Sequence, residues 1–344
     1  MTELNVTGIS PAAGIAGGEA IVGLRGATPD MVSRLEVRIC GADAHVVSVN
    51  TKRAIILVPD IDSDGPMPVR VATDPADGGN NSDINFTLGR RIAWNIHPVT
   101  NPAFDPSSGA LLVTRSGSRG EHVPVSIFRW TLENGLEDFS GDVTNPTAIV
   151  FDRTGRMFVT SRFDGTVYRV TSDREVIAFA SELGIATGLA FNREGEMFVG
   201  DRSGTIHRVN EIGEAEPWAE HEPSVSAYHL AFGPDDNLYV SGPTVSSFDS
   251  ITKFDESGHA SVFYRGLGRP QGLAFDREGN LYVAAALRGR RGIVKISPDG
   301  RDAELMVTGM NVVGLAFGPK GEMVVATNEA VYRLPLNIPG LLLP

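Results

Sequence analysis

A six-fold internal repeat constrains the fold of this chain more than any other feature of its sequence. The repeat is anchored by phenylalanines whose spacings, by subtraction of residue numbers, are 47, 40, 41, 43 and 42 residues: Phe104, Phe151, Phe191, Phe232, Phe275 and Phe317. Around each anchor a phrase such as GLAFDREGNLYV (residues 272–283) recurs. Two alternating apolar runs around a turn rich in Asp and Gly predict a pair of antiparallel strands.

Two further strands follow most of these pairs. In the second repeat they are GTVYRV (residues 165–170) and REVIAFAS (residues 174–181). Four strands in about 42 residues predict one blade of a β-propeller. The sixth repeat lacks its own fourth strand, whereas RRIAWNIHPVT (residues 90–100) precedes the first repeat. We therefore expect this N-terminal strand to complete the last blade of a six-bladed ring, which leaves no open sheet edge.

The chain upstream of the repeat contains short alternating apolar segments separated by Gly, Pro, Asn and Asp. This spacing predicts a small antiparallel sandwich of the immunoglobulin type. Because Cys40 is the single cysteine, apolar packing must hold that sandwich without a disulfide. We expect an all-β protein with a sandwich at residues 1–89, a propeller at 90–337 and an apolar tail at 338–344, which packs on the same chain by default.

The N-terminal segment also carries a family resemblance. Ile9-Ser10-Pro11, then Gly14, then Gly17-Gly18 before a strand that ends at Gly26 resembles the opening of an IPT/TIG domain. This resemblance implies a spacer or interaction module and assigns no chemistry to the segment.

Composition excludes several classes of partner. The formal net charge of −12 argues against general affinity for nucleic acid or anionic membranes. No apolar run is long enough for a membrane span. The start, MTELNVTGIS, lacks the features of a secretory signal. The compartment is therefore open: cytoplasmic as the sequence is written, extracytoplasmic if a leader was removed.

The repeats, over roughly residues 90–335, resemble NHL propellers and the gluconolactonase (senescence-marker) family. That resemblance implies a six-bladed enzyme that opens sugar lactones. It also implies one divalent cation, held by carboxylate and Asn side chains just before the GLAF step of particular blades. A hard cation needs several oxygen ligands, and it would polarise the lactone carbonyl and activate water.

The corresponding positions here, which we call the column, contain no carboxylate: Thr100, Thr147, Thr187, Tyr228, Gln271 and Val313. The Glu of the family aligns with Thr100, one Asn with Gln271, and the Asp with Val313. We therefore predict no catalytic residue, no metal ligand and no cofactor. A divalent cation (Ca²⁺ or Zn²⁺) is expected only if the lactonase interpretation holds, and whether the chain is an enzyme stays open.

The next position inward holds Asn101 in the first repeat and His229 in the fourth. His229 stands where most repeats have Gly or Ala, and we expect it to fill the channel beside Tyr228 and donate to a neighbouring carbonyl. His97, His221 and His229 have no metal-ligand spacing.

In each blade the first strand crosses the ring and the second returns, so the DREG-type turns lie on one face. We call this the bottom face and the opposite one the top face. The loops after the second strands carry arginines that we expect on the top face: Arg115, Arg119, Arg162, Arg202, Arg288, Arg290 and Arg291. Guanidinium groups bind carboxylate and phosphate bidentately, so a cationic mouth would suit an anionic ligand.

The leading hypothesis is a recognition module for a small anionic or sugar-like ligand, or a protein partner, at the top face. The alternatives are a metal-dependent sugar lactonase or related hydrolase or lyase, and a pure protein-interaction scaffold. The candidate ligand-binding residues are Thr100, Asn101, Thr147, Arg162, Thr187, Asp201, Arg202, Tyr228, His229 and Gln271.

Overall fold

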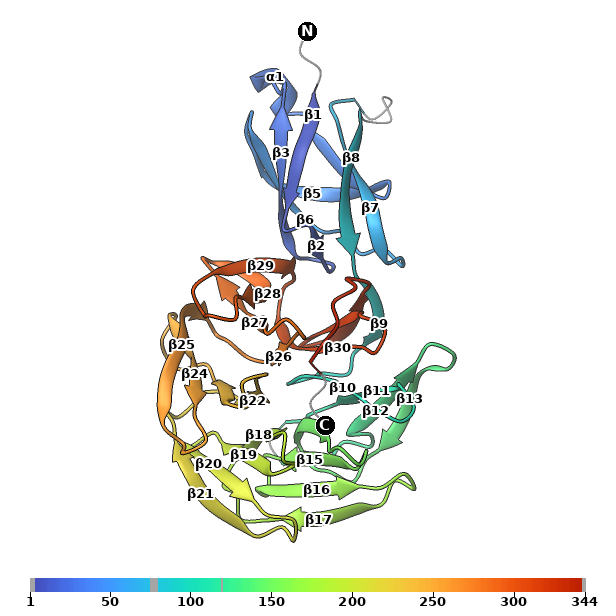
Figure 1. Ribbon diagram of the computed structural model, residues 1–344. Coiled ribbons are helices and arrows are strands. Elements are labelled where there is room, and N and C mark those ends of the chain that lie inside the picture. The colour runs from blue at the N-terminus through green and yellow to red at the C-terminus, as the bar shows by residue number, and fades with distance from the viewer. Residues whose placement is uncertain (1–3, 75–79, 119, 342–344) are drawn as a thin grey trace.

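The computed structural model describes residues 4–74, 80–118 and 120–341 of the chain. Nearly all regular structure in these residues is β, in a propeller-like ring of sheets with an N-terminal unit stacked on it (Figure 1). The described residues include a single helix, the four-residue α1 (Pro29–Val32). No helix in this part of the chain is long and apolar enough to cross a membrane.

The N-terminal unit, residues 4–88, is built from short strands: β1 (Asn5–Ser10), β2 (Ala13–Gly14), β3 (Glu19–Arg25), β4 (Glu36–Ile39), β5 (Ala42–Val49), β6 (Arg53–Leu57), β7 (Gly65–Ala72) and β8 (Asn80–Leu88). The strand order is β1-β3-β6-β5-β4-β7-β8, and β8 contacts β1 again. Buried and exposed positions alternate along β3, as its sequence predicts. The buried side chains, Val22, Ile56 and Phe86 among them, form one apolar core.

The repeats fold as series of four antiparallel strands. The first three are β10 (Ala103–Phe104), β11 (Leu111–Thr114), β12 (Ile127–Thr131), β13 (Gly135–Ser140); β14 (Pro146–Phe151), β15 (Met157–Ser161), β16 (Thr166–Val170), β17 (Val176–Ala180); β18 (Ala186–Phe191), β19 (Met197–Asp201), β20 (Thr205–Val209), β21 (Ala215–Glu220).

The later repeats continue this order: β22 (His229–Phe232), β23 (Leu238–Ser241), β24 (Asp249–Phe254), β25 (Ala260–Gly268); β26 (Leu273–Phe275), β27 (Leu281–Leu287), β28 (Arg290–Ile296), β29 (Ala303–Thr308); β30 (Val312–Phe317), β31 (Met323–Thr327), β32 (Ala330–Leu334). The end of β25 also pairs with β27, which joins the fourth and fifth repeats into one sheet.

The ring closes through β9 (Arg90–Trp94), which pairs antiparallel with β32 as the fourth strand of the last repeat. The sequence-based prediction of this closure is confirmed. The first strands of successive repeats contact one another, and β10 contacts both β14 and β30. The inner strands therefore surround a common channel.

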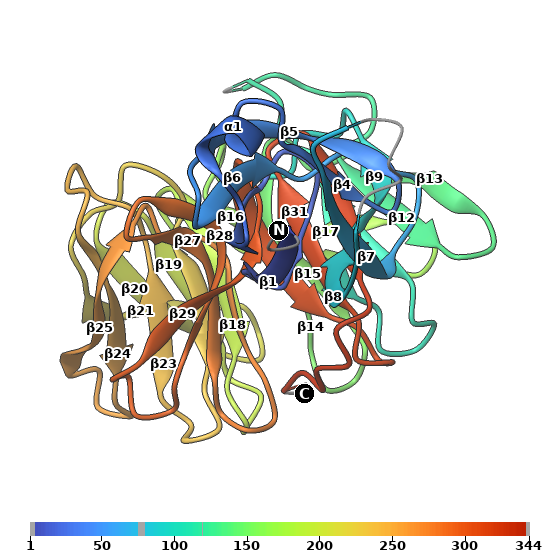
Figure 2. The same cartoon turned by 90° about the horizontal axis from the view of Figure 1, so that it is seen from above.

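Strand β2 ties the N-terminal unit to the ring. It pairs in parallel with β8 on one side and with β29 on the other, so one sheet runs through both parts (Figures 1 and 2). Ile15 N donates to Thr308 O over 2.9 Å, and Thr308 Oγ1 donates to Glu19 O over 2.7 Å. Arg290 Nη2 donates to Ser10 O at 2.7 Å and to Glu19 O at 3.1 Å. These bonds fix the unit against the fifth repeat.

The C-terminal tail lies on the bottom face of the ring. Ile338 N donates to Gly321 O over 2.8 Å, and Leu341 N donates to Phe275 O over 2.8 Å. Gly340 forms an isolated antiparallel bridge with Asp276. The expected packing of the tail on its own chain is confirmed up to residue 341, and residues 342–344 lie outside the described residues.

The junction depends on Gly18, where an added Cβ would lie 2.7 Å from the backbone C and O of Thr308. Because backbone cannot move aside as a side-chain tip can, we expect Gly18→Ala to lower the free energy of unfolding by about 1 to 3 kcal/mol. The matched control is Gly8→Ala, whose Cβ meets nothing within 4 Å. Urea unfolding of both variants checks this, and equal stability would contradict it.

Candidate functional site: an arginine-lined hollow on the top face

Two of the three threonines of the column bond to neighbouring repeats through their side chains, whereas Oγ1 of Thr147 is buried without a described hydrogen-bond partner. Thr100 Oγ1 donates to Thr147 O over 3.0 Å, and Thr187 Oγ1 accepts from Tyr228 N over 3.0 Å. All four of these residues are buried. The hydroxyls of Thr100 and Thr187 thus connect adjacent inner strands.

Asn101 bridges the channel between three repeats. Its Nδ2 donates to Leu273 O over 2.9 Å, and its Oδ1 accepts from Leu315 N over 3.0 Å. The side chain therefore satisfies one backbone acceptor of β26 and one backbone donor of β30. This use of both ends of the amide leaves Asn101 a structural part of the ring.

The column does not fit a hard divalent cation. Such an ion needs several oxygen ligands, some of them charged. Here no column residue is a carboxylate, the hydroxyls of Thr100 and Thr187 already bond to backbone groups, and Val313 offers no side-chain ligand atom. Among the described residues, no group of three or more His, Cys, Asp or Glu side chains could hold a metal ion.

Three other candidates lie in or beside loops of the second and third repeats: Arg162, Asp201 and Arg202. Arg162 Nη2 donates to Gly117 O over 3.3 Å. The buried Asp201 carboxylate accepts from the backbone N–H groups of Ile185 and Ser203, at 2.9 and 3.0 Å. It thereby shapes the loop after β19.

His229 lies in β22 beside Tyr228 and is buried, but none of the described carbonyls accepts a hydrogen bond from it. Its Nε2 atom is buried without a hydrogen-bond partner in the described chain. The expectation of a bond to a neighbouring carbonyl was therefore wrong: no described carbonyl accepts from it. Burial lowers the pKa of His229 to about 3 and that of His221 to about 4, so both rings are neutral at pH 7.

The largest hollow near the predicted mouth lies elsewhere on the top face, over the fourth, fifth and sixth repeats. We call it the arginine hollow, and its volume is about 1020 Å³. Gln271 is the one candidate residue that lines it. Its polar and charged lining also includes Thr244, Ser246, Ser247, Arg269, Arg288, Arg291, Asn311 and Asn328.

The charged side chains that line the hollow are all positive. Three arginines line it, Arg269, Arg288 and Arg291, and the described lining contains no carboxylate. All three side chains are exposed, and none has an ion-pair or hydrogen-bond partner among residues 4–74, 80–118 and 120–341. Unpaired guanidinium groups without a neighbouring acid present a positive field to a ligand.

Only some of the arginines expected on the top face line the hollow. Arg288 and Arg291 line the hollow, whereas Arg290 bonds to the N-terminal unit. Arg119 lies outside the described residues. The expectation therefore holds where the fifth repeat meets the sixth, because the second strand of that repeat, β27, and the strand that follows it, β28, extend further than their counterparts.

One wall of the hollow is apolar. Phe248 is 59% exposed and Val245 is 96% exposed, and both lie on the loop between β23 and β24. The guanidinium of Arg265 lies 5.8 Å from the centre of the Phe248 ring. An exposed aromatic side chain beside unpaired arginines suits an anion that carries an apolar or planar body.

Sequence reasoning missed Arg269, although a signal was present. Arg269 stands two residues before Gln271, and the matching step holds Asn145 in the second repeat and Asn311 in the sixth. All three have positive φ, at 48°, 46° and 56°. Asn tolerates this left-handed conformation better than Arg does. An Arg at a position whose backbone conformation favours Asn indicates a role other than stabilising the fold.

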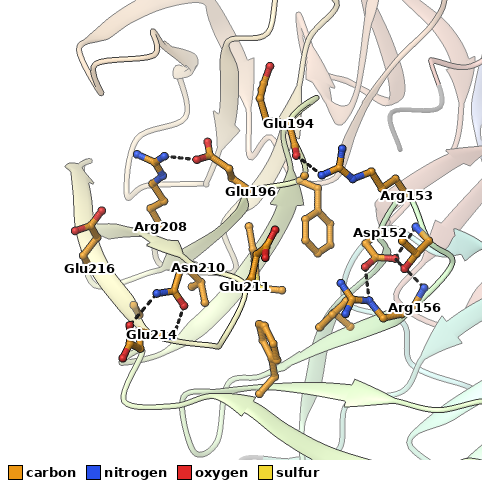
Figure 3. A pocket seen from close by; sticks show the side chains of 18 residues that line it. Asp152, Arg153, Arg156, Glu194, Glu196, Arg208, Asn210, Glu211, Glu214 and Glu216 are labelled. Carbon is orange, nitrogen blue, oxygen red and sulfur yellow. Dashed lines mark hydrogen bonds and ion pairs between the residues drawn. The ribbon is translucent and has the colours of Figure 1, made fainter.

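A second groove, between the second and third repeats, contrasts with the hollow (Figure 3). Several of its charged side chains pair with one another. Arg156 Nε donates to Asp152 Oδ2 over 2.6 Å, and Arg208 donates to Glu196. Asn210 Nδ2 likewise donates to Glu214 Oε2 over 2.9 Å. The described lining also holds the carboxylates of Glu194, Glu211 and Glu216, so this groove, unlike the hollow, is lined by acids as well as arginines.

The two bonds of Asn101 generate a stability prediction. Asn101→Ala leaves Leu273 O and Leu315 N buried and unpaired, so we expect the free energy of unfolding to fall by about 2 to 4 kcal/mol. Asn328→Ala, at an exposed position, is the control and should change it by less than about 0.5 kcal/mol. Urea unfolding followed by tryptophan fluorescence measures both; equal stabilities would show that the bridge does not hold the ring.

The side chains of the column lead to a prediction about the metal content of the protein. After incubation with Ca²⁺, Mn²⁺, Mg²⁺ and Zn²⁺ and desalting, we expect the purified protein to retain no divalent ion at one per chain, because neutral hydroxyls bind such ions feebly. Elemental mass spectrometry measures the content. A stoichiometric ion would contradict this assignment of the column.

Comparison with known proteins supports the fold. No protein-family model matches the chain, and no curated protein matches it. Among solved structures, an auxiliary nutrient binding protein from Bacteroides thetaiotaomicron is 14% identical, with a TM-score of 0.55 over 96% of this chain and 97% of its own.

Two solved enzymes match the chain over a shorter length. A gluconolactonase from Xanthomonas campestris is 16% identical, with a TM-score of 0.57 over 73% of this chain and 90% of its own. A virginiamycin B lyase from Staphylococcus aureus is 13% identical, with a TM-score of 0.51 over 71% of this chain and 86% of its own. At such identities the likeness concerns the fold alone: this chain is similar in architecture to propellers of the gluconolactonase type.

Proposed function

We propose that this chain is a non-catalytic binding protein that holds a small anionic molecule in the arginine hollow. In this proposal residues 90–337 form a six-bladed propeller of the gluconolactonase/NHL type, and residues 1–89 form an IPT/TIG-like immunoglobulin sandwich. The described part of the apolar tail, residues 338–341, covers part of the bottom face. The support for six blades is the closed series of inner-strand contacts.

One observation carries the functional proposal: three unpaired arginines meet in one hollow without a described carboxylate, in a chain of net charge −12. Maintaining Arg269 and Arg288 at positive φ also costs free energy that the fold does not require. Binding of an anion accounts for both features.

The rest of the lining narrows the class of ligand. Gln271, Asn311 and Asn328 can bond to hydroxyl or carbonyl groups, while Phe248 can cover a flat or apolar part. We therefore propose a carboxylate or phosphate on a small organic or sugar-like body. The name of the nutrient-binding neighbour agrees with a binding role.

Of the candidate ligand-binding residues named from the sequence, Gln271 remains part of the proposed site. Arg269, Arg288 and Arg291 join it. Residues such as Thr100, Thr187 and Asp201 are not part of it, because their polar groups already bond within the protein.

Two alternatives remain outcomes of the tests. A sugar lactonase or related lyase would require a divalent cation, Ca²⁺ or Zn²⁺, and the elemental analysis above addresses it. A pure scaffold for protein partners would bind no small anion at all. The net charge gives no support to nucleic acid as a partner.

The test uses 2-naphthoate, a planar carboxylate, as the ligand in calorimetric titrations of the full chain. We expect Arg269→Asn, Arg288→Gln and Arg291→Gln each to weaken binding about threefold to tenfold, because each removes one charge-assisted contact. Added salt should weaken binding to the native protein as well. Arg277→Gln, an exposed arginine on the bottom face, is the matched control and should bind normally.

Arg269→Asn separates function from folding. Asn is the residue at this step in two other repeats, so the variant should be as stable as the native protein or up to about 1 kcal/mol more stable. Loss of affinity without loss of stability supports the arginine hollow. Unchanged affinity in all three variants, or no binding of 2-naphthoate, would overturn the proposal.

A further inference from the structure

The central channel contains a further cavity, distinct from the arginine hollow and from the groove of Figure 3, and it opens at the bottom face. Its volume is about 470 Å³, within the range of small-molecule sites, and we call it the channel cavity. Its walls are parts of the inner strands, and turns of the first, second and sixth repeats surround its mouth. Leu341 of the tail also lines it. The cavity shares no lining residue with the arginine hollow.

Small side chains create this space. Ala148, Gly188, Ala274 and Ala316 line the cavity from four inner strands, where larger residues would close the channel. Asn101 also lines it and bonds across the channel. The repeats therefore meet closely at Asn101 and leave room below it.

The cavity wall includes a buried histidine. His229 is 4% exposed, and its Nε2 has no hydrogen-bond partner within the described part of the chain. Buried polar groups in proteins are nearly always hydrogen-bonded, and an unpaired one costs about 1 to 3 kcal/mol. A Leu of similar size would fill the same place without that cost. The fold alone gives no reason for this histidine.

We propose that the channel cavity binds an uncharged, largely apolar small molecule whose hydroxyl group pairs with the imidazole of His229. Half-buried apolar side chains in the described lining, Val150, Ala274 and Ala316 among them, can cover an apolar body. A neutral imidazole has one donor and one acceptor nitrogen, and a hydroxyl can pair with either.

A charged ligand does not fit this cavity. The ionised groups among its described lining are Asp105, Asp152 and Arg153, all on turns at the mouth. The Asp105 carboxylate accepts from Ser107 and Ser108, and Asp152 accepts from the Arg156 side chain. An ion placed beside His229 would be desolvated without a counter-charge, which is strongly unfavourable. The two cavities therefore select opposite kinds of ligand.

The test compares 2-naphthol with naphthalene, its hydrocarbon, by ligand-observed NMR titration of the full chain at pH 7. We expect saturable binding, tighter for 2-naphthol by about fivefold to tenfold, as one hydrogen bond provides. His229→Leu should abolish this preference while leaving the thermal midpoint equal or higher, because no existing bond is lost. Arg288→Gln, at the arginine hollow, should not change either affinity.

A second variant keeps the test decisive if His229→Leu does not fold. Ala316→Phe leaves His229 in place and fills part of the cavity, so binding of both compounds should weaken at least tenfold. Binding of 2-naphthol that is equal in native protein and His229→Leu would overturn the proposal. So would the absence of saturable binding to the native protein, which would mean that the cavity holds water alone.

Discussion

The pairing of β9 with β32 is the interaction on which the rest of the structure depends. A series of four-stranded sheets arranged around an axis has two free ends until one strand from the start of the series joins the last sheet. Here Val331 pairs with Ala93 and Arg333 with Arg90, so the last sheet receives its fourth strand from the start of the ring. This closure brings β10 against β30 and defines the central channel. The channel cavity, which residues of the first and sixth repeats line together, depends on this closure.

Closure also explains why the column is structural. Where inner strands converge, each unpaired backbone group must find a partner away from water. Thr100, Thr187 and Asn101 provide those partners between repeats. A chain that uses its column in this way has little polar capacity left there for a metal ion. The architecture shared with the gluconolactonase type thus need not retain a metal site.

The two cavities differ in a way that follows from their positions. The arginine hollow lies among long top-face loops, where exposed guanidinium groups stay hydrated and need no partner in the unbound protein. The channel cavity lies among inner strands, where only small or apolar side chains fit and a neutral histidine is tolerated. Bulk water can solvate charge in the first site and not in the second, so each favours a different chemistry.

Much of the fold could be read from the repeat because strand periodicity and turn residues are local properties. The spacing of the phenylalanines, the turns after them and the unpaired segment at residues 90–100 required no knowledge of distant contacts. The insertion of β2 between β8 and β29 could not be read in this way. Its two residues carry no pattern of their own, and only the junction of two folded parts gives them partners.

The composition of the candidate functional site depended more on tertiary structure than the fold did. The sequence by itself determined which residues enter the top-face loops and the inner strands, because the repeat assigns each position to a face. Only the folded ring decided that Asn101 bonds across the channel, that Asp201 serves its own loop, and that Arg269 joins Arg288 and Arg291. The physical reason is that side-chain reach and unpaired charge depend on neighbours from other repeats, and those distances exist only after the chain has closed.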